Sequence, residues 1–151
     1  MSLLNRTQLL TAMRAHRFAV QASASTAGSP EAAVVGVVVT DAFELFFDTL
    51  RTTRKMRNLR ANPAVAFVLG GTVEGDERTV QYEGIADEPQ GSELAALQRI
   101  YFERFPDGRE RQSWPDLVYV RVRPRWLRYS DYNTAPPTIV ELDAQQLAAL
   151  T

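Results

Sequence analysis

The sequence predicts a mainly β fold, a closed or nearly closed antiparallel barrel with flanking helices, in one domain over residues 1–151. Two observations carry this prediction. The apolar runs at 32–40 and 64–69 show no polar alternation, a pattern typical of strands buried on both faces. The segment 117–123 alternates strictly between valines and other residues, which indicates a strand with one face toward a core. Because strands buried on both faces leave few tolerable edges, a curled sheet is favoured over a flat one.

The remaining elements follow from local patterns along the chain. Apolar residues at helical spacing predict helices over 3–15 and 92–105, and Asp143 is placed to cap a short final helix. Further strands share a β-compatible composition and neighbouring turn residues; they are expected at 17–25, 43–49, 78–86 and 125–132. No shift in composition and no internal repeat marks a second domain.

The most informative segment is 49–63, which reads T-L-R-T-T-R-K-M-R-N-L-R-A-N-P. It holds five cations and no acid, and Lys55 is the only lysine of the chain. Thr52 or Thr53 is a natural N-cap for a short helix, and Pro63 ends that helix because the residue before a proline avoids the helical conformation. Hydroxyls, free N–H groups and cations at the positive end of a helix form an anion site, most often for phosphate. A solvated basic helix face is the alternative; the strands directly before and after the helix favour phosphate.

Composition and charge exclude several classes of function. The formal net charge is −1, so the basic segment is a local feature, and a dedicated nucleic-acid binder would carry a positive domain. The absence of cysteine excludes disulfides, thiolate metal sites and cysteine nucleophiles. A single histidine, His16, argues against a multi-histidine metal site and against a Ser-His-Asp triad. Without a signal peptide or a long apolar span, we expect a cytoplasmic protein with no membrane partner, and the preference for arginine over lysine indicates a bacterial, GC-rich genome.

The order F-F-D-T-x-x-x-T-R-K-x-R-N-L-x-x-N-P, followed by an apolar strand and V-Q-Y-E-G, resembles the pyridoxamine-phosphate-oxidase-like, FMN-binding split-barrel family. The resemblance extends over residues 17–132. It implies a six-stranded antiparallel split β-barrel, a homodimer, and one FMN in each of two clefts between the subunits.

The resemblance also implies roles for individual residues. Arg54 and Lys55 correspond to the phosphate-binding pair of the family, and Thr53 to the small hydroxyl residue before that pair. Thr49 falls at the threonine that touches the flavin, and Thr79 at a flavin-contacting glutamine. The strand 34–38 corresponds to the stretch that lines the isoalloxazine ring, and Asp48 is an acid beside the expected cofactor. The expected cofactor-binding residues are therefore Val35, Val37, Asp48, Thr49, Thr53, Arg54, Lys55 and Thr79.

The chain departs from genuine pyridoxamine phosphate oxidases at the substrate site. Those enzymes carry an arginine and a lysine at the ends of the lining strand, where Ala33 and Val38 stand here. They also end in an Arg-x-His motif, and this chain has no histidine after His16. Vitamin-B6 oxidation is therefore not expected.

The function implied is that of an FMN-dependent oxidoreductase acting on a small molecule, in which flavin N5 gives or accepts a hydride. Because that chemistry belongs to the cofactor, the sequence need not contain a recognisable catalytic pair. Two alternatives stay open. One is a deazaflavin coenzyme, which also carries a phosphate that the same helix could hold. The other is a flavin- or haem-binding protein without turnover, and for haem His16 is the only candidate axial ligand.

Overall fold

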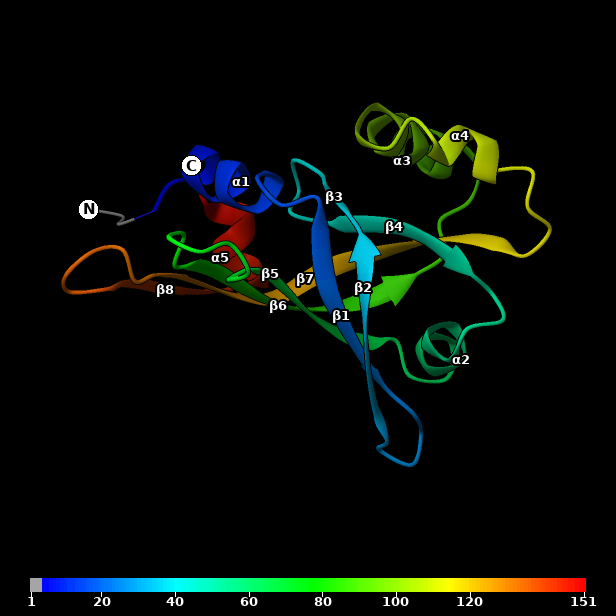
Figure 1. Ribbon diagram of the computed structural model, residues 1–151, viewed down its shortest axis with the longest axis horizontal. Helices are drawn as coiled ribbons and strands as arrows, with labels where there is room; N and C mark the ends of the chain where they lie inside the picture. Colours follow the sequence, from blue (N-terminus) through cyan, green and yellow to red (C-terminus); the bar gives the residue numbers. More distant parts are fainter. Residues whose placement is uncertain (1–3) are drawn as a thin grey trace.

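The computed structural model describes residues 4–151, which form one antiparallel sheet and five helices (Figure 1). In chain order the elements are α1 (Arg6–Arg14), β1 (Phe18–Ala24), β2 (Pro30–Gly36), β3 (Val38–Val39), β4 (Leu45–Leu50), α2 (Arg54–Ala61), β5 (Ala64–Gly70), β6 (Arg78–Asp87), α3 (Gly91–Arg104), α4 (Gly108–Arg111), β7 (Leu117–Asp131), β8 (Thr138–Asp143) and α5 (Ala144–Ala149). None of the helices between residues 4 and 151 has the length and apolar character needed to cross a membrane.

The strand order makes the sheet curl. The strands pair in the order β2-β1-β5-β6-β7-β4-β3, and β8 adds to β7. Only Val37 separates β2 from β3 in the chain, although these two strands stand at opposite ends of that order. The two ends of the sheet therefore meet at Val37, whose backbone N–H donates to the carbonyl of Arg17 at 3.0 Å. This curled antiparallel sheet with flanking helices fits a split barrel.

The structure corrects the expected strands in two respects. The sheet has eight strands and not six. The valine run 32–40 divides into β2 and β3, the segments 117–123 and 125–132 form the single strand β7, and β8 was not expected after the prolines at 136 and 137. The expectation that 32–40 and 64–69 are buried on both faces is wrong for the single chain, since Val34 is 67% exposed and Val68 is 43% exposed. One face of this part of the sheet is therefore open.

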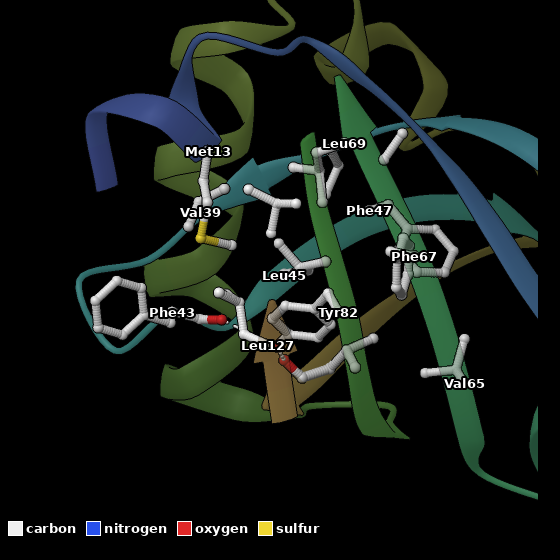
Figure 2. Packing of buried hydrophobic residues seen from close by; sticks show 14 of the residues in the cluster. Met13, Val39, Phe43, Leu45, Phe47, Val65, Phe67, Leu69, Tyr82 and Leu127 are labelled. Carbon is white, nitrogen blue, oxygen red and sulfur yellow. Dashed lines mark hydrogen bonds between the residues drawn. The ribbon is translucent and has the colours of Figure 1, made fainter. Parts of the chain in front are cut away.

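The main core fills the inside of the curled sheet (Figure 2). The rings of Phe47 and Tyr82 both meet that of Phe67 edge to face, with centroids 6.0 Å apart in each pair. α1 contributes Leu9 and Met13 to this core, and α2 contributes buried residues of its own. The helix that carries the basic segment is therefore fixed against the barrel by its apolar face.

A second, smaller core lies on the outer face of β4. Phe46 points away from the main core and packs with Tyr101 and Phe105 of the α3 region. The ring of Tyr119 on β7 stacks on Phe46 at 5.5 Å. α3 and α4 therefore cover the outer face over β3, β4 and the neighbouring part of β7 (Figure 1). They reach β1 and β2 only at Phe18 and Gly36, on which Phe105 packs, and the outer face beyond these two residues is open.

Candidate functional site

The candidate phosphate site begins where β4 ends. Thr53 is the N-cap of α2: its Oγ1 accepts from the N–H of Met56 at 3.3 Å and donates to the carbonyl of Leu50 at 2.9 Å. Of the two expected caps, Thr52 and Thr53, the structure selects the second. The N–H groups of the first two helical residues have no acceptor within the helix, as at every helix start, so this end of α2 carries a partial positive charge.

Lys55 is the most unusual residue of this site. Its side chain is only 8% exposed, and its ammonium donates to the hydroxyl of Thr49 at 3.3 Å. Across residues 4–151, no carboxylate lies within ion-pair distance of it. Burying a charge without a counter-ion is strongly unfavourable, and a bound anion at this position would offset that cost. The donors present therefore fit a phosphate group.

The other cations of the segment divide into two sets. Arg60 is bound to Glu88 through two hydrogen bonds of 2.9 and 3.0 Å, and Arg51 lies 3.6 Å from Asp116. Arg54 and Arg57 are exposed and form no ion pair within the described residues. Arg54 is the first residue of α2, whereas Arg57 lies nearly a turn further along. Arg54 and Lys55 are thus the two cations at the helix start that no acid neutralises.

Asp48 has protein partners on both of its oxygens. It accepts from the hydroxyl of Tyr101 at 2.8 Å and from Nε of Arg111 at 2.8 Å. Burial and the charge of Asp48 raise the pKa of Tyr101 above its usual range. These bonds fasten β4 to α3 and α4. A contact between Asp48 and a cofactor stays a prediction. The cofactor would have to bind a carboxylate that already accepts hydrogen bonds from Tyr101 and Arg111.

Val35 and Val37 lie with their side chains in the main core and are almost fully buried. Because side chains alternate along a strand, the neighbour that β2 presents on the outside is Val34. A flavin ring along this strand would meet Val34 and the backbone, whereas the ring of Phe105 already packs on Gly36. A contact of Val35 and Val37 with a flavin ring stays a prediction. Because their side chains lie in the main core, their backbone atoms would have to make that contact.

Thr79 lies far from the phosphate site in the same chain. Thr49 pairs with Val118 of β7, and Thr79 pairs with Ser130 of the same strand. These partners are twelve residues apart, which corresponds to roughly 40 Å of extended strand. Figure 1 shows the start of β6 and α2 at opposite ends of the sheet. One chain therefore does not bring Thr79 near the candidate phosphate site, and the expected contact of Thr79 with a flavin stays a prediction, which a second chain would have to satisfy.

The open face of the sheet carries an apolar row in register. Val20 of β1 pairs with Val34 on one side and with Val68 on the other, and all three side chains are exposed. Beside this row runs a groove of about 630 Å³, floored by the small side chains of Ala22 and Ala66 and walled by Trp126. No described residue covers this face, which is suited to contact with another molecule.

His16 lies at the junction of α1 and β1. Its Nε2 is 3.0 Å from the position that a Cβ on Gly70 would take, so the imidazole edge packs on that glycine. It also lines a hollow of about 250 Å³ between α1 and α3. To ligate a metal through Nε2, the ring would have to turn away from Gly70.

The comparisons with known proteins agree with the fold. A family model described as pyridoxamine 5'-phosphate oxidase matches residues 6–131. No curated protein matches the sequence.

Several solved structures resemble the chain in fold at low sequence identity. A haem binding protein from Mycobacterium smegmatis superposes with a TM-score of 0.82 at 18% identity, over 99% of this chain and 62% of that protein. A haem storage protein from Vibrio cholerae, HutZ, gives 0.70 at 16% identity, over 81% of this chain and 92% of that one. A pyridoxamine 5'-phosphate oxidase-related, FMN binding protein from Nostoc punctiforme gives 0.66 at 13% identity, over 94% and 87%. At these identities the likeness is one of fold.

Proposed function

Because the chain belongs to the pyridoxamine 5'-phosphate oxidase-like split-barrel family, we propose that it binds FMN and holds the phosphate at Arg54 and Lys55. The observation that carries the proposal is the buried residue Lys55, whose ammonium has the neutral hydroxyl of Thr49 as its one partner among residues 4–151. A phosphate would make charge-assisted hydrogen bonds with Lys55 and Arg54, which are about twice as strong as neutral ones. The helix dipole of α2 favours the same anion.

Each residue of the site has a separate task in this proposal. Lys55 contributes a fixed charge, because burial and the bond to Thr49 restrict its side chain. Arg54 is exposed and free to close over the phosphate from the solvent side. Thr53 holds the first turn of α2 in place. The bound flavin supplies hydride chemistry at N5, and the chain supplies position and a cleft.

We further propose that the chain acts as a homodimer with the cofactor between subunits. The row Val34, Val20 and Val68 and the adjoining groove form an uncovered apolar face, and stable interfaces bury about 1,200–2,000 Å² in total. A single chain offers a phosphate site but does not bring Thr79 to it. A second chain across the open face would complete the cleft.

Two other cofactors remain alternatives. A deazaflavin coenzyme would use the same phosphate contacts and the same reaction class. Haem would need His16 as its axial ligand, and the packing of its Nε2 on Gly70 opposes this without a rearrangement. The visible spectrum of the purified protein separates the three, since flavin, deazaflavin and haem absorb at different wavelengths.

The decisive experiment is a titration of FMN into the apoprotein, followed by quenching of flavin fluorescence. The double variant Arg54→Ala/Lys55→Ala should lose about 100- to 10,000-fold in affinity, from two charge-assisted bonds of about 1.5–3 kcal/mol each. Arg57→Ala/Arg60→Ala removes the same number of charges from the same helix and should change affinity less than about fivefold, since Arg60 is bound to Glu88. Equal losses in the two variants would mean that the helix is only a generally basic surface.

A further inference from the structure

A second candidate site lies between α1 and α3, away from the basic segment. A hollow of about 250 Å³ has the backbone of 37–39 as its floor. Arg14 and His16 form one wall at the end of α1, and Ile100 and Arg104 form the other wall on α3. Figure 1 shows α1 and α3 on either side of β3, which is the strand at the bottom of this hollow.

The two arginines of the hollow differ in how they are held. Arg14 donates from Nε to the carbonyl of Val39 at 3.1 Å and from Nη2 to Asp41 at 2.7 Å, so its guanidinium is fixed, while Nη1 has no partner among residues 4–151. Arg104 forms no hydrogen bond or ion pair within residues 4–151. Glu103 is the one acid that lines the hollow. The guanidinium of Arg14 is thus paired with Asp41, whereas that of Arg104 has no acid bound to it within residues 4–151, and both groups face the same space.

The rest of the lining is apolar. Ile100 is 40% exposed on the face of α3 that borders the hollow, and Val38 lies in the floor between Val37 and Val39, whose side chains belong to the main core. The volume lies below the 300–1,000 Å³ usual for drug-sized ligands, so a flavin or a haem does not fit within it. A molecule of about ten non-hydrogen atoms has the right size.

We propose that this hollow binds a small organic monocarboxylate with an apolar body. The carboxylate pairs with Arg104 and with Nη1 of Arg14, in the geometry that planar guanidinium groups favour. The apolar body lies on Ile100 and Val38. The proposal is independent of FMN, because none of these residues belongs to the phosphate site at α2.

Benzoate is a suitable probe, and benzamide is its neutral counterpart of the same shape. Titrating each into the full-length, 15N-labelled protein and following backbone amide shifts should give a Kd for benzoate of about 1–10 mM. The shifts should centre on residues 14–16, 37–39 and 100–104. Benzamide should bind at least tenfold more weakly, because it lacks the charge that the guanidinium groups recognise. Equal affinity for the two probes, or no shifts at 50 mM benzoate, would overturn the proposal.

Two variants of α3 sharpen the test. Arg104→Gln should weaken benzoate at least tenfold, whereas Arg99→Gln, which removes an exposed arginine outside the hollow on the same helix, should change the Kd less than twofold. Equal effects would show a diffuse attraction to a positive surface and refute the site. Lys55→Met should leave benzoate binding unchanged; if benzoate binding is lost in Lys55→Met and kept in Arg104→Gln, the probe sits at the phosphate site and this proposal fails.

Discussion

The ammonium of Lys55 lies 3.3 Å from the hydroxyl of Thr49, and this contact joins the end of β4 to the first turn of α2. Thr49 lies near the end of β4 and Lys55 is the second residue of α2, so the partner of the charge is a neutral oxygen. The arrangement is unfavourable for the free protein and favourable for binding an anion. Stability and binding should therefore respond in opposite directions to the loss of this charge.

Lys55→Met tests that opposition. Methionine has a similar volume and helix propensity, and it removes a buried charge that has no counter-ion. We expect the free energy of unfolding of the apoprotein to stay equal or to rise by about 1 kcal/mol, while FMN affinity falls about 10- to 100-fold. Urea denaturation of the apo forms and FMN titration measure the two quantities. A variant that loses stability and keeps its FMN affinity would contradict the assignment of this residue.

The open face of the sheet gives a prediction about assembly. Val20→Lys places a charge in the middle of the row formed with Val34 and Val68, and like charges from two copies would then meet in the interface. We expect light scattering at micromolar concentration to change from the mass of a dimer to that of a monomer. Val73→Lys, at an exposed valine in the loop before β6, is the matched control and should stay dimeric. A native protein that scatters as a monomer would exclude the proposed dimer.

Asp87 gives a prediction about stability at low pH. Hydrogen bonds from Arg121, and then the charges of Arg121 and Arg123, lower the pKa of Asp87 in the folded protein. The unfolded chain therefore takes up a proton at higher pH than the folded one, so this contribution is complete above the usual aspartate value of about 4 and is lost as the pH falls below it.

Melting temperatures between pH 2 and pH 7 test this effect. Asp87→Asn should be less stable than the native protein at pH 7, and the difference should shrink below about pH 4. Glu74→Gln, at an exposed loop acid without an ion pair in the described part of the chain, is the control and should follow the native curve. A constant difference between Asp87→Asn and the native protein across the range would refute the linkage.

Local signals in the sequence were sufficient for the helix that carries the phosphate site. The expected end at Pro63 agrees with a helix that stops at Ala61, and the expected caps include the observed Thr53. The strand expected at 78–86 agrees closely with β6 at Arg78–Asp87. Caps, prolines and turn residues act within a few positions of one another, so a single sequence displays them directly.

Contacts between distant segments could not be predicted in the same way. The partners of Asp48 lie 53 and 63 residues further along the chain, and no residue pattern near Asp48 predicts them. The unbroken valines of 32–40 give no alternation, so the sequence does not say which of them face the core. The break at Val37 is likewise a product of the curl, because β2 pairs only with β1 and β3 only with β4.

The position of β7 in the sheet has a consequence for biosynthesis. β7 pairs with β4, with β6 and with β8, so two strands made earlier each keep one edge unpaired until residues 117–131 leave the ribosome. The 44 residues from the end of β6 to the end of β7 take about 2–9 s to elongate. Through that interval the nascent chain offers two free strand edges, which are the surfaces that seed aggregation. α3 and α4 are encoded within the same interval, so the residues of these two helices lengthen the time for which the edges stay free.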